Sequence, residues 1–172
     1  IDMGAPRRPA DVLKIMGETK TYKLSPAIMW VIRYREGNVL NRKKIGAMKV
    51  QLFLESNPGI RNSLEMCVDL RIMSIPVAAA CHYLMRKKDE TLADLFIDGL
   101  INGFPKVGVS DPFFSFRERM IQNQGSQARL LPYLQMGMMI KAWSLARKDK
   151  KITEPIAYKA YGKGAEEFPE II

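Results

Sequence analysis

The chain has 172 residues, of which 47% are hydrophobic, and its 27 Lys and Arg against 18 Asp and Glu give a formal net charge of +9. This much apolar sequence excludes an intrinsically disordered chain, and the length suffices to bury one core without disulfides. No apolar run reaches the ~18 residues that a membrane-spanning helix needs, so we expect no membrane partner. The excess of positive charge favours a polyanionic partner.

The cysteine content is low. Cys67 and Cys81 both fall in helix-like segments, which does not fit a disulfide framework. We expect both to be buried, reduced thiols of a cytoplasmic protein. Because the chain opens on Ile1 within what looks like the middle of a motif, we also expect it to be part of a longer protein.

The predicted elements are helices, because apolar residues recur at three- and four-residue steps and strand-like alternation is nearly absent. Ser25, Asn41 and Asp89 are expected N-caps, and proline stands in several first turns. The expected helices run, in chain order, from Pro9 to Met16, from Ser25 to the stop at Gly37-Asn38, from Asn41 to the break at Asn57-Pro58-Gly59, from Ile60 to Met73, from Val77 to Lys88, from Asp89 through Leu100, from Pro112 to Gly125 and from Leu131 to Lys151.

The same periodicity assigns inward-facing residues. Met48, Leu52, Val68 and Leu95 are among the residues expected in the core. The last helix has the widest apolar stripe and is predicted to be a core spine; its recurring positions are Leu134, Met138, Ile140, Lys141, Leu145 and Lys148, with Trp143 between them.

The fold class follows from this pattern. We predict an all-α protein, a single multi-helix bundle of about seven or eight helices. Residues 1–151 form the helical domain, and residues 152–172, with Pro155, Gly162, Gly164 and Pro169, form an irregular C-terminal tail packed on it.

Positive charge is concentrated in two stretches. Residues 1–50 hold eleven Lys and Arg against four acids, with Tyr22, Trp30 and Tyr34 among them, and the last helix ends in a second group. Cations with interleaved aromatics suit a phosphate backbone and stacked bases, although a solvated face with Trp30 in the core gives the same pattern. The residues predicted to bind nucleic acid are Arg7, Arg8, Arg42, Lys43, Lys44, Arg147, Lys148, Lys150 and Lys151.

Two further interpretations concern binding. The helices on either side of residues 38–44 could form a helix-turn-helix, although the turn is long for one. Alternatively, Met136, Met138 and Met139, among eleven methionines, could form an adaptable surface for protein interaction or homo-oligomerisation, or simply fill the core.

Residues suited to catalysis are scarce. His82 is the single histidine, and its neighbours do not have metal-ligand spacing. Two acid pairs are at helical spacing and are typical of solvated helix faces: Asp94 with Asp98, and Glu65 with Asp69. The run Gly162-Lys163-Gly164 lacks the preceding strand and following helix of a phosphate-binding loop. We therefore expect no enzymatic activity, no metal and no cofactor.

The opening segment, Asp2-Met3-Gly4-Ala5-Pro6-Arg7-Arg8-Pro9-Ala10-Asp11-Val12-Leu13, carries a resemblance. It is similar to the junction that follows the ParB-like N-terminal domain of certain phage and plasmid proteins, through Asp2, Gly4, Arg7, Ala10, Asp11, Val12 and Leu13. The runs 140–143 and 167–171 resemble the ends of such proteins. The Asp-Gly-Gln-His-Arg motif of that domain is absent here, so the resemblance implies a DNA-linked role in mobile-element biology and no enzymatic chemistry.

Overall fold

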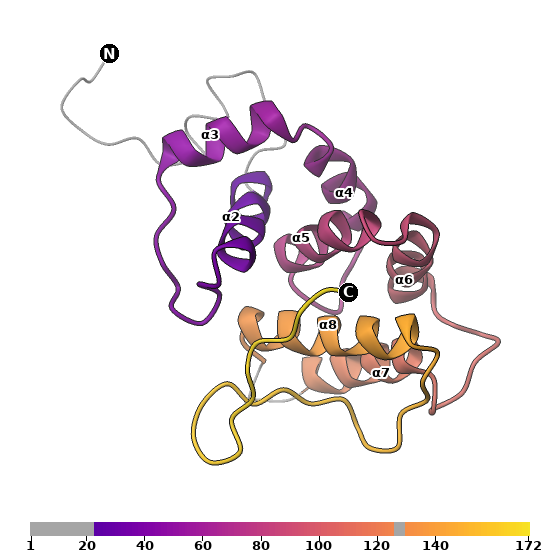
Figure 1. Ribbon diagram of the computed structural model, residues 1–172. Coiled ribbons are helices and arrows are strands. Elements are labelled where there is room, and N and C mark those ends of the chain that lie inside the picture. Colours follow the sequence, from indigo (N-terminus) through magenta and orange to yellow (C-terminus); the bar gives the residue numbers. More distant parts are fainter. Residues whose placement is uncertain (1–22, 126–129) are drawn as a thin grey trace.

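The computed structural model describes residues 23–125 and 130–172, and within these ranges it contains seven helices and no strand (Figure 1). The all-α class is therefore confirmed. The predicted helix over Pro9–Met16 lies outside the described residues. The helices are α2 (Leu24–Arg35), α3 (Ala47–Ser56), α4 (Ile60–Cys67), α5 (Ile75–Arg86), α6 (Glu90–Asn102), α7 (Pro112–Gln124) and α8 (Pro132–Arg147).

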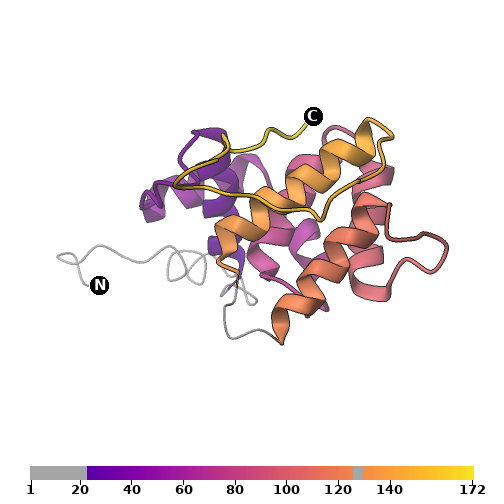
Figure 2. The same cartoon turned by 90° about the horizontal axis from the view of Figure 1, so that it is seen from below.

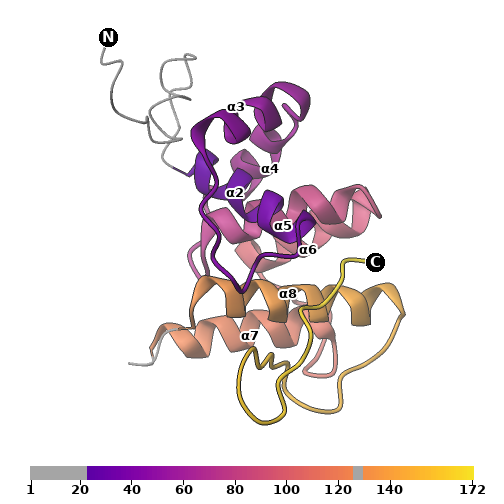
Figure 3. The ribbon, with the colours of Figure 1, turned by 60° about the vertical axis from the view of Figure 1, so that its left-hand side comes forward.

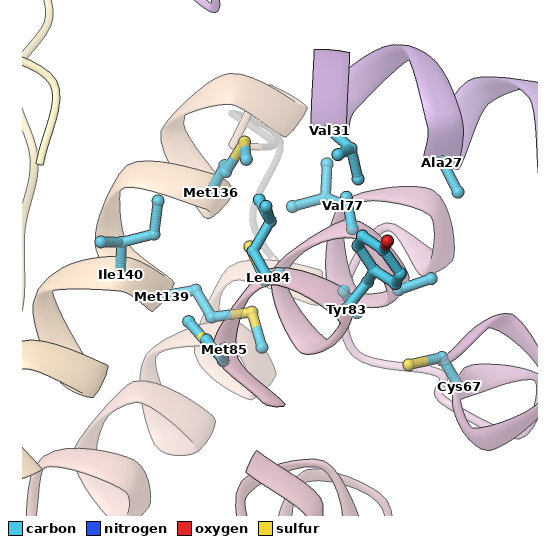
Figure 4. Close-up of a cluster of buried hydrophobic side chains, with 14 of the residues drawn as sticks. Ala27, Val31, Cys67, Val77, Tyr83, Leu84, Met85, Met136, Met139 and Ile140 are labelled. Atoms are coloured by element: carbon cyan, nitrogen blue, oxygen red, sulfur yellow. The ribbon is translucent and has the colours of Figure 1, made fainter. Parts of the chain in front are cut away.

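Helix α5 is at the centre of the molecule. It packs against α2, α4, α6 and α8, and each of its residues from Val77 to Met85 is buried. The run Ala78-Ala79-Ala80 allows these neighbours to approach closely because its side chains are small. Figure 4 shows the resulting core, in which Val31 of α2 and Met139 of α8 approach α5 from different sides.

Helix α8 is a core helix, but α5 rather than α8 contacts most of the other helices. Met136, Met138, Met139, Ile140 and Trp143 are buried, so burial extends around most of α8 and not along a single stripe. Helices α7 and α8 lie side by side as a pair below the others (Figure 3). Helix α8 ends at Arg147 and not at the predicted Lys151, because Asp149 adopts the left-handed conformation, with φ 51°.

The predicted caps have different outcomes. Asp89 caps α6 by accepting the backbone N–H of Leu92, as predicted. Ser25 is not a cap, because α2 begins one residue earlier and buries it within the first turn. Asn41 is not one either, because residues 41–46 are not helical and α3 begins at Ala47.

Several residues expected in the core are on the surface. Met48 and Leu52 of α3 are 65% and 55% exposed, because this helix buries Val50 and Leu54 instead. Leu95 is exposed on α6. Val68 is exposed because α4 ends at Cys67, well before the predicted end at Met73.

Residues 152–172 have no regular structure, yet they are held in place against α8 (Figure 2). Tyr158 and Ile171 are buried, and Tyr158 lies directly over Gly137, where a Cβ would come within 2.6 Å of its ring. Trp143 donates from Nε1 to the carbonyl of Ile172 at 2.9 Å. Helix α8 is thus covered by helices on one side and by this tail on another.

Candidate nucleic-acid interface

The structure separates the predicted interface residues into two groups at opposite ends of α8. Arg42 places its guanidinium over the ring of Tyr133, in the first turn of α8, at 5.1 Å from the ring centroid. Arg147 is the last residue of the same helix. At 1.5 Å per residue, the two ends are about 20 Å apart. Arg7 and Arg8 lie outside the described residues.

The first group lies on the connection between α2 and α3, residues 36–46, which reaches the N-terminal end of α8 (Figures 1 and 3). Arg42 has φ 49°, a left-handed conformation that arginine rarely adopts. The backbone there is also fixed by Arg33, whose Nε donates to the carbonyl of Lys43 at 3.0 Å. These contacts hold Arg42, Lys43 and Lys44 at the surface, where all three are exposed.

Two more cations join them from the tail, at the loop formed by residues 159–166. Lys159 donates from Nζ to the carbonyl of Lys163, and both lysines are exposed. The tail loop meets the α2–α3 connection through Tyr161, whose hydroxyl donates to the carbonyl of Leu40 at 3.0 Å. We call the resulting surface the loop patch; its cations are Arg42, Lys43, Lys44, Lys159 and Lys163.

The cations of the loop patch lack ion-pair partners among the residues that the structure describes. Among residues 23–125 and 130–172, none of the five forms an ion pair. Of the nearby acids, Glu36 pairs with Lys49 and Glu166 pairs with Lys141 at 2.8 Å, whereas Glu167 lies beside Leu40 and Asn41 and is a counter-charge close to the patch. The hydrogen bond from Lys49 holds the pKa of Glu36 below its ordinary value, so this acid stays ionised and occupied.

The second group lies after the end of α8. Lys148, Lys150 and Lys151 are exposed, and we call these three the helix-end patch. Arg147 does not belong to it, because its guanidinium pairs with Asp89 at 3.1 Å and also donates to the carbonyl of Ile172. The Arg147–Asp89 ion pair brings this end of α8 next to the run Arg86-Lys87-Lys88, because Asp89 directly follows that run. The sequence prediction did not include these three cations. Arg86 is itself paired with Glu90, and Asp149 lies within the helix-end patch. These acids reduce the net positive charge at this end of α8.

Two of the aromatic residues noted among the N-terminal cations, Trp30 and Tyr34, lie partly buried beside the first group. Trp30 is half-buried beneath Arg33, with the guanidinium 5.1 Å from its ring. Tyr34 packs on Phe168 and accepts the backbone N–H of Ile171 at 2.8 Å. Burial raises the pKa of Tyr34. Tyr22 lies outside the described residues.

The helix-turn-helix interpretation does not fit the second helix of the pair. A recognition helix needs polar and cationic side chains on its exposed face. Helix α3 instead exposes Met48 and Leu52, and its single lysine, Lys49, is paired with Glu36. The cations of this region lie on the connection that precedes α3.

A hydrogen-bonded chain of serine, histidine and aspartate forms elsewhere. His82 is 2% exposed; its Nδ1 lies 2.8 Å from Ser63 Oγ and its Nε2 lies 2.7 Å from Asp94 Oδ1. Because a carboxylate only accepts, Nε2 of the neutral ring donates to Asp94 and Nδ1 accepts from the Ser63 hydroxyl. Ser63 is fully buried, so its hydroxyl is not accessible to a substrate, and we interpret the chain as a structural contact between α4, α5 and α6.

The cysteines are also buried. Both are free, and burial raises the pKa of the Cys67 thiol to about 12 and that of Cys81 further. These thiols are therefore protonated and inert at neutral pH. Within the part of the chain that the structure describes, no cluster of His, Cys, Asp or Glu has the arrangement of a metal site.

Comparisons with known proteins give no family. No family model, curated protein or solved structure matches this chain. None of the described helices has the length and apolar character to cross a bilayer. The functional assignment therefore depends on the geometry and charge of the two patches.

Proposed function

We propose that this chain is a helical domain that binds nucleic acid, with DNA as the expected partner, through contacts between the loop patch and the phosphate backbone. The supporting observation is that five cations, none of which forms an ion pair with another described residue, converge from two loops around Arg42 and Tyr161. Lysine and arginine side chains in this arrangement suit a chain of phosphates better than a single small ligand, because they spread over a surface.

The binding energy would come from counterion release. Each lysine or arginine that neutralises a phosphate releases a condensed cation from the nucleic acid, which makes affinity fall as salt rises. The helix-end patch, about 20 Å away along α8, would contribute less because Asp149 and the paired acids reduce its potential.

The resemblance of residues 2–13 to ParB-like proteins of phages and plasmids supports DNA over RNA. It adds Arg7 and Arg8 as further candidate phosphate contacts. The reading frame upstream of Ile1 tests the family: an Asp-Gly-Gln-His-Arg stretch there would support membership, and a frame without one would remove this argument.

Two matched variants test the proposal. The loop-patch variant changes Lys43, Lys44 and Lys163 to Gln, and the control changes Lys148, Lys150 and Lys151 to Gln. Fluorescence anisotropy with a labelled oligonucleotide is measured from 50 to 200 mM salt. We expect the loop-patch variant to lower the slope of log affinity against log salt by about two, since each phosphate contact contributes about 0.7–0.9.

The control variant should lower the same slope by less than the loop-patch variant. Wild-type binding that is absent at low salt, or that ignores salt, would contradict the proposal. A larger effect of the control variant would move the interface to the other end of α8.

Protein interaction is the second candidate function. Met136, Met138 and Met139 cannot form its contact surface because all three are buried. The exposed pair Met48 and Leu52, one turn apart on α3, is the observation that still favours it. Light scattering with cross-linking separates the two functions: a stable homo-oligomer without nucleic-acid affinity would favour this one.

A further inference from the structure

Tyr161 differs from the other aromatic residues of the described chain. It is the one aromatic residue there that is mostly exposed, at 58%. The tryptophans, phenylalanines and other tyrosines of these ranges are buried or half-buried. An exposed ring of this kind loses the burial that usually stabilises an aromatic residue, so its position needs a reason.

The ring is exposed but held in place. The Tyr161 hydroxyl donates to the carbonyl of Leu40, and its ring makes an edge contact with Tyr133 at 6.3 Å. Tyr133 is buried, and the Arg42 guanidinium lies over its ring in a cation–π contact, 5.1 Å from the ring centroid. Tyr161 is therefore fixed at both its hydroxyl and its ring, and a partner that stacks on it would not have to order a free side chain.

The charges around it identify the partner. Tyr161 lies between the cations of the α2–α3 connection and those of the tail loop, Lys159 and Lys163. A fixed aromatic ring within a cationic surface is the arrangement by which proteins bind single strands, because the cations follow the phosphates while an unpaired base stacks on the ring. In a duplex the bases stack on one another, and their faces are not available.

From this arrangement we infer that the loop patch recognises single-stranded nucleic acid in preference to duplex, with Tyr161 as the platform on which one base stacks. The absence of a helix in the patch agrees with this preference. Its cations stand on residues 42–44, 159 and 163, which are all outside the described helices, so the patch has no element to enter a major groove.

This inference rests on the proposed function, and the experiment separates the two. Wild-type, Tyr161→Leu and Tyr161→Phe proteins are titrated with a 20-residue oligo(dT), the same length of oligo(U) and a duplex of equal length, at one salt concentration. Tyr161→Phe is the matched control because it keeps the ring and loses only the hydrogen bond to Leu40.

We expect the wild type to bind both single strands more tightly than the duplex. Tyr161→Leu should lose about tenfold in affinity for the single strands, the loss that one stacked base gives, and should lose no more affinity for the duplex than Tyr161→Phe loses. Tyr161→Phe should keep most of the affinity. Equal losses for all three probes would mean that Tyr161 only joins the two loops, and would overturn the inference while leaving the proposed function intact.

A second measurement uses the wild-type protein alone, so its result does not depend on whether the Tyr161 variants fold. A single strand containing 5-iodouracil is cross-linked by light, and the modified peptide is identified by mass spectrometry. Cross-linking at Tyr161 supports the inference, and cross-linking confined to other residues overturns it. A wild type that binds no probe would overturn the proposed function itself, and the inference with it.

Discussion

At the scale of single residues, His82 shows how a buried polar group is satisfied and what it contributes to stability. Burial lowers the pKa of His82, and the hydrogen bond to Asp94 opposes this shift without reversing it. The ring is therefore neutral in the folded protein at neutral pH. It makes the Ser63 and Asp94 contacts in the uncharged form, and these contacts join the three consecutive helices α4, α5 and α6.

The lowered pKa predicts how stability depends on pH. As the pH falls below about 6.5, the unfolded chain binds a proton that the folded ring does not, so the free energy of unfolding decreases. The decrease stops once the pH is below the pKa of the folded ring. Because His82 is the only histidine, His82→Gln should flatten the profile between pH 5.5 and 7 in urea unfolding. A His82→Gln variant with the wild-type pH dependence would contradict this.

At the scale of elements, the positions of the helices could be predicted more reliably than their buried faces. Asp89 with Glu90, and Asp111 with Pro112, combine a capping oxygen with a good first turn, so these helix starts depend on adjacent residues alone. The exposure of Met48 could not be predicted in the same way. Periodicity shows only that apolar residues recur along α3. The packing of α3 on α2 determines that Val50, and not Met48, faces the core.

The contact between the tail and α8 gives a prediction at this scale. Gly137 lies under Tyr158, and a Cβ there would come within 2.6 Å of Cδ1 and 2.7 Å of Cγ of the ring. Alanine favours a helix over glycine by up to about 1 kcal/mol, but we expect the overlap to outweigh this gain. Gly137→Ala should destabilise the protein by about 1–3 kcal/mol.

Thermal unfolding and limited tryptic cleavage at Lys159 and Lys163 measure this effect. Gly108→Ala is the control, because a Cβ at Gly108 meets no atom within 4 Å. Cleavage in the tail should be faster in Gly137→Ala than in the control. Equal melting temperatures and equal cleavage rates for the two variants would show that the tail does not depend on this contact.

At the scale of the whole molecule, the sequence indicated only part of the candidate site. Arg42, Lys43 and Lys44 were predicted because they are consecutive cations next to a turn signal. Lys159, Lys163 and Tyr161 were missed, since the hydrogen bond that brings the tail to this surface joins residues 121 apart. No local pattern encodes a contact of that range. The separation of the two cationic groups likewise follows from the length of α8 and not from their own residues.

The central claim is that the loop patch is the main surface at which nucleic acid binds. Backbone amide NMR of the wild type titrated with oligo(dT) tests it directly. The claim predicts that shifts concentrate at residues 40–44 and 159–163 and at the start of α8, with little change on α3 or α6. Shifts that concentrate at residues 148–151, or that spread evenly over all exposed lysines, would contradict it.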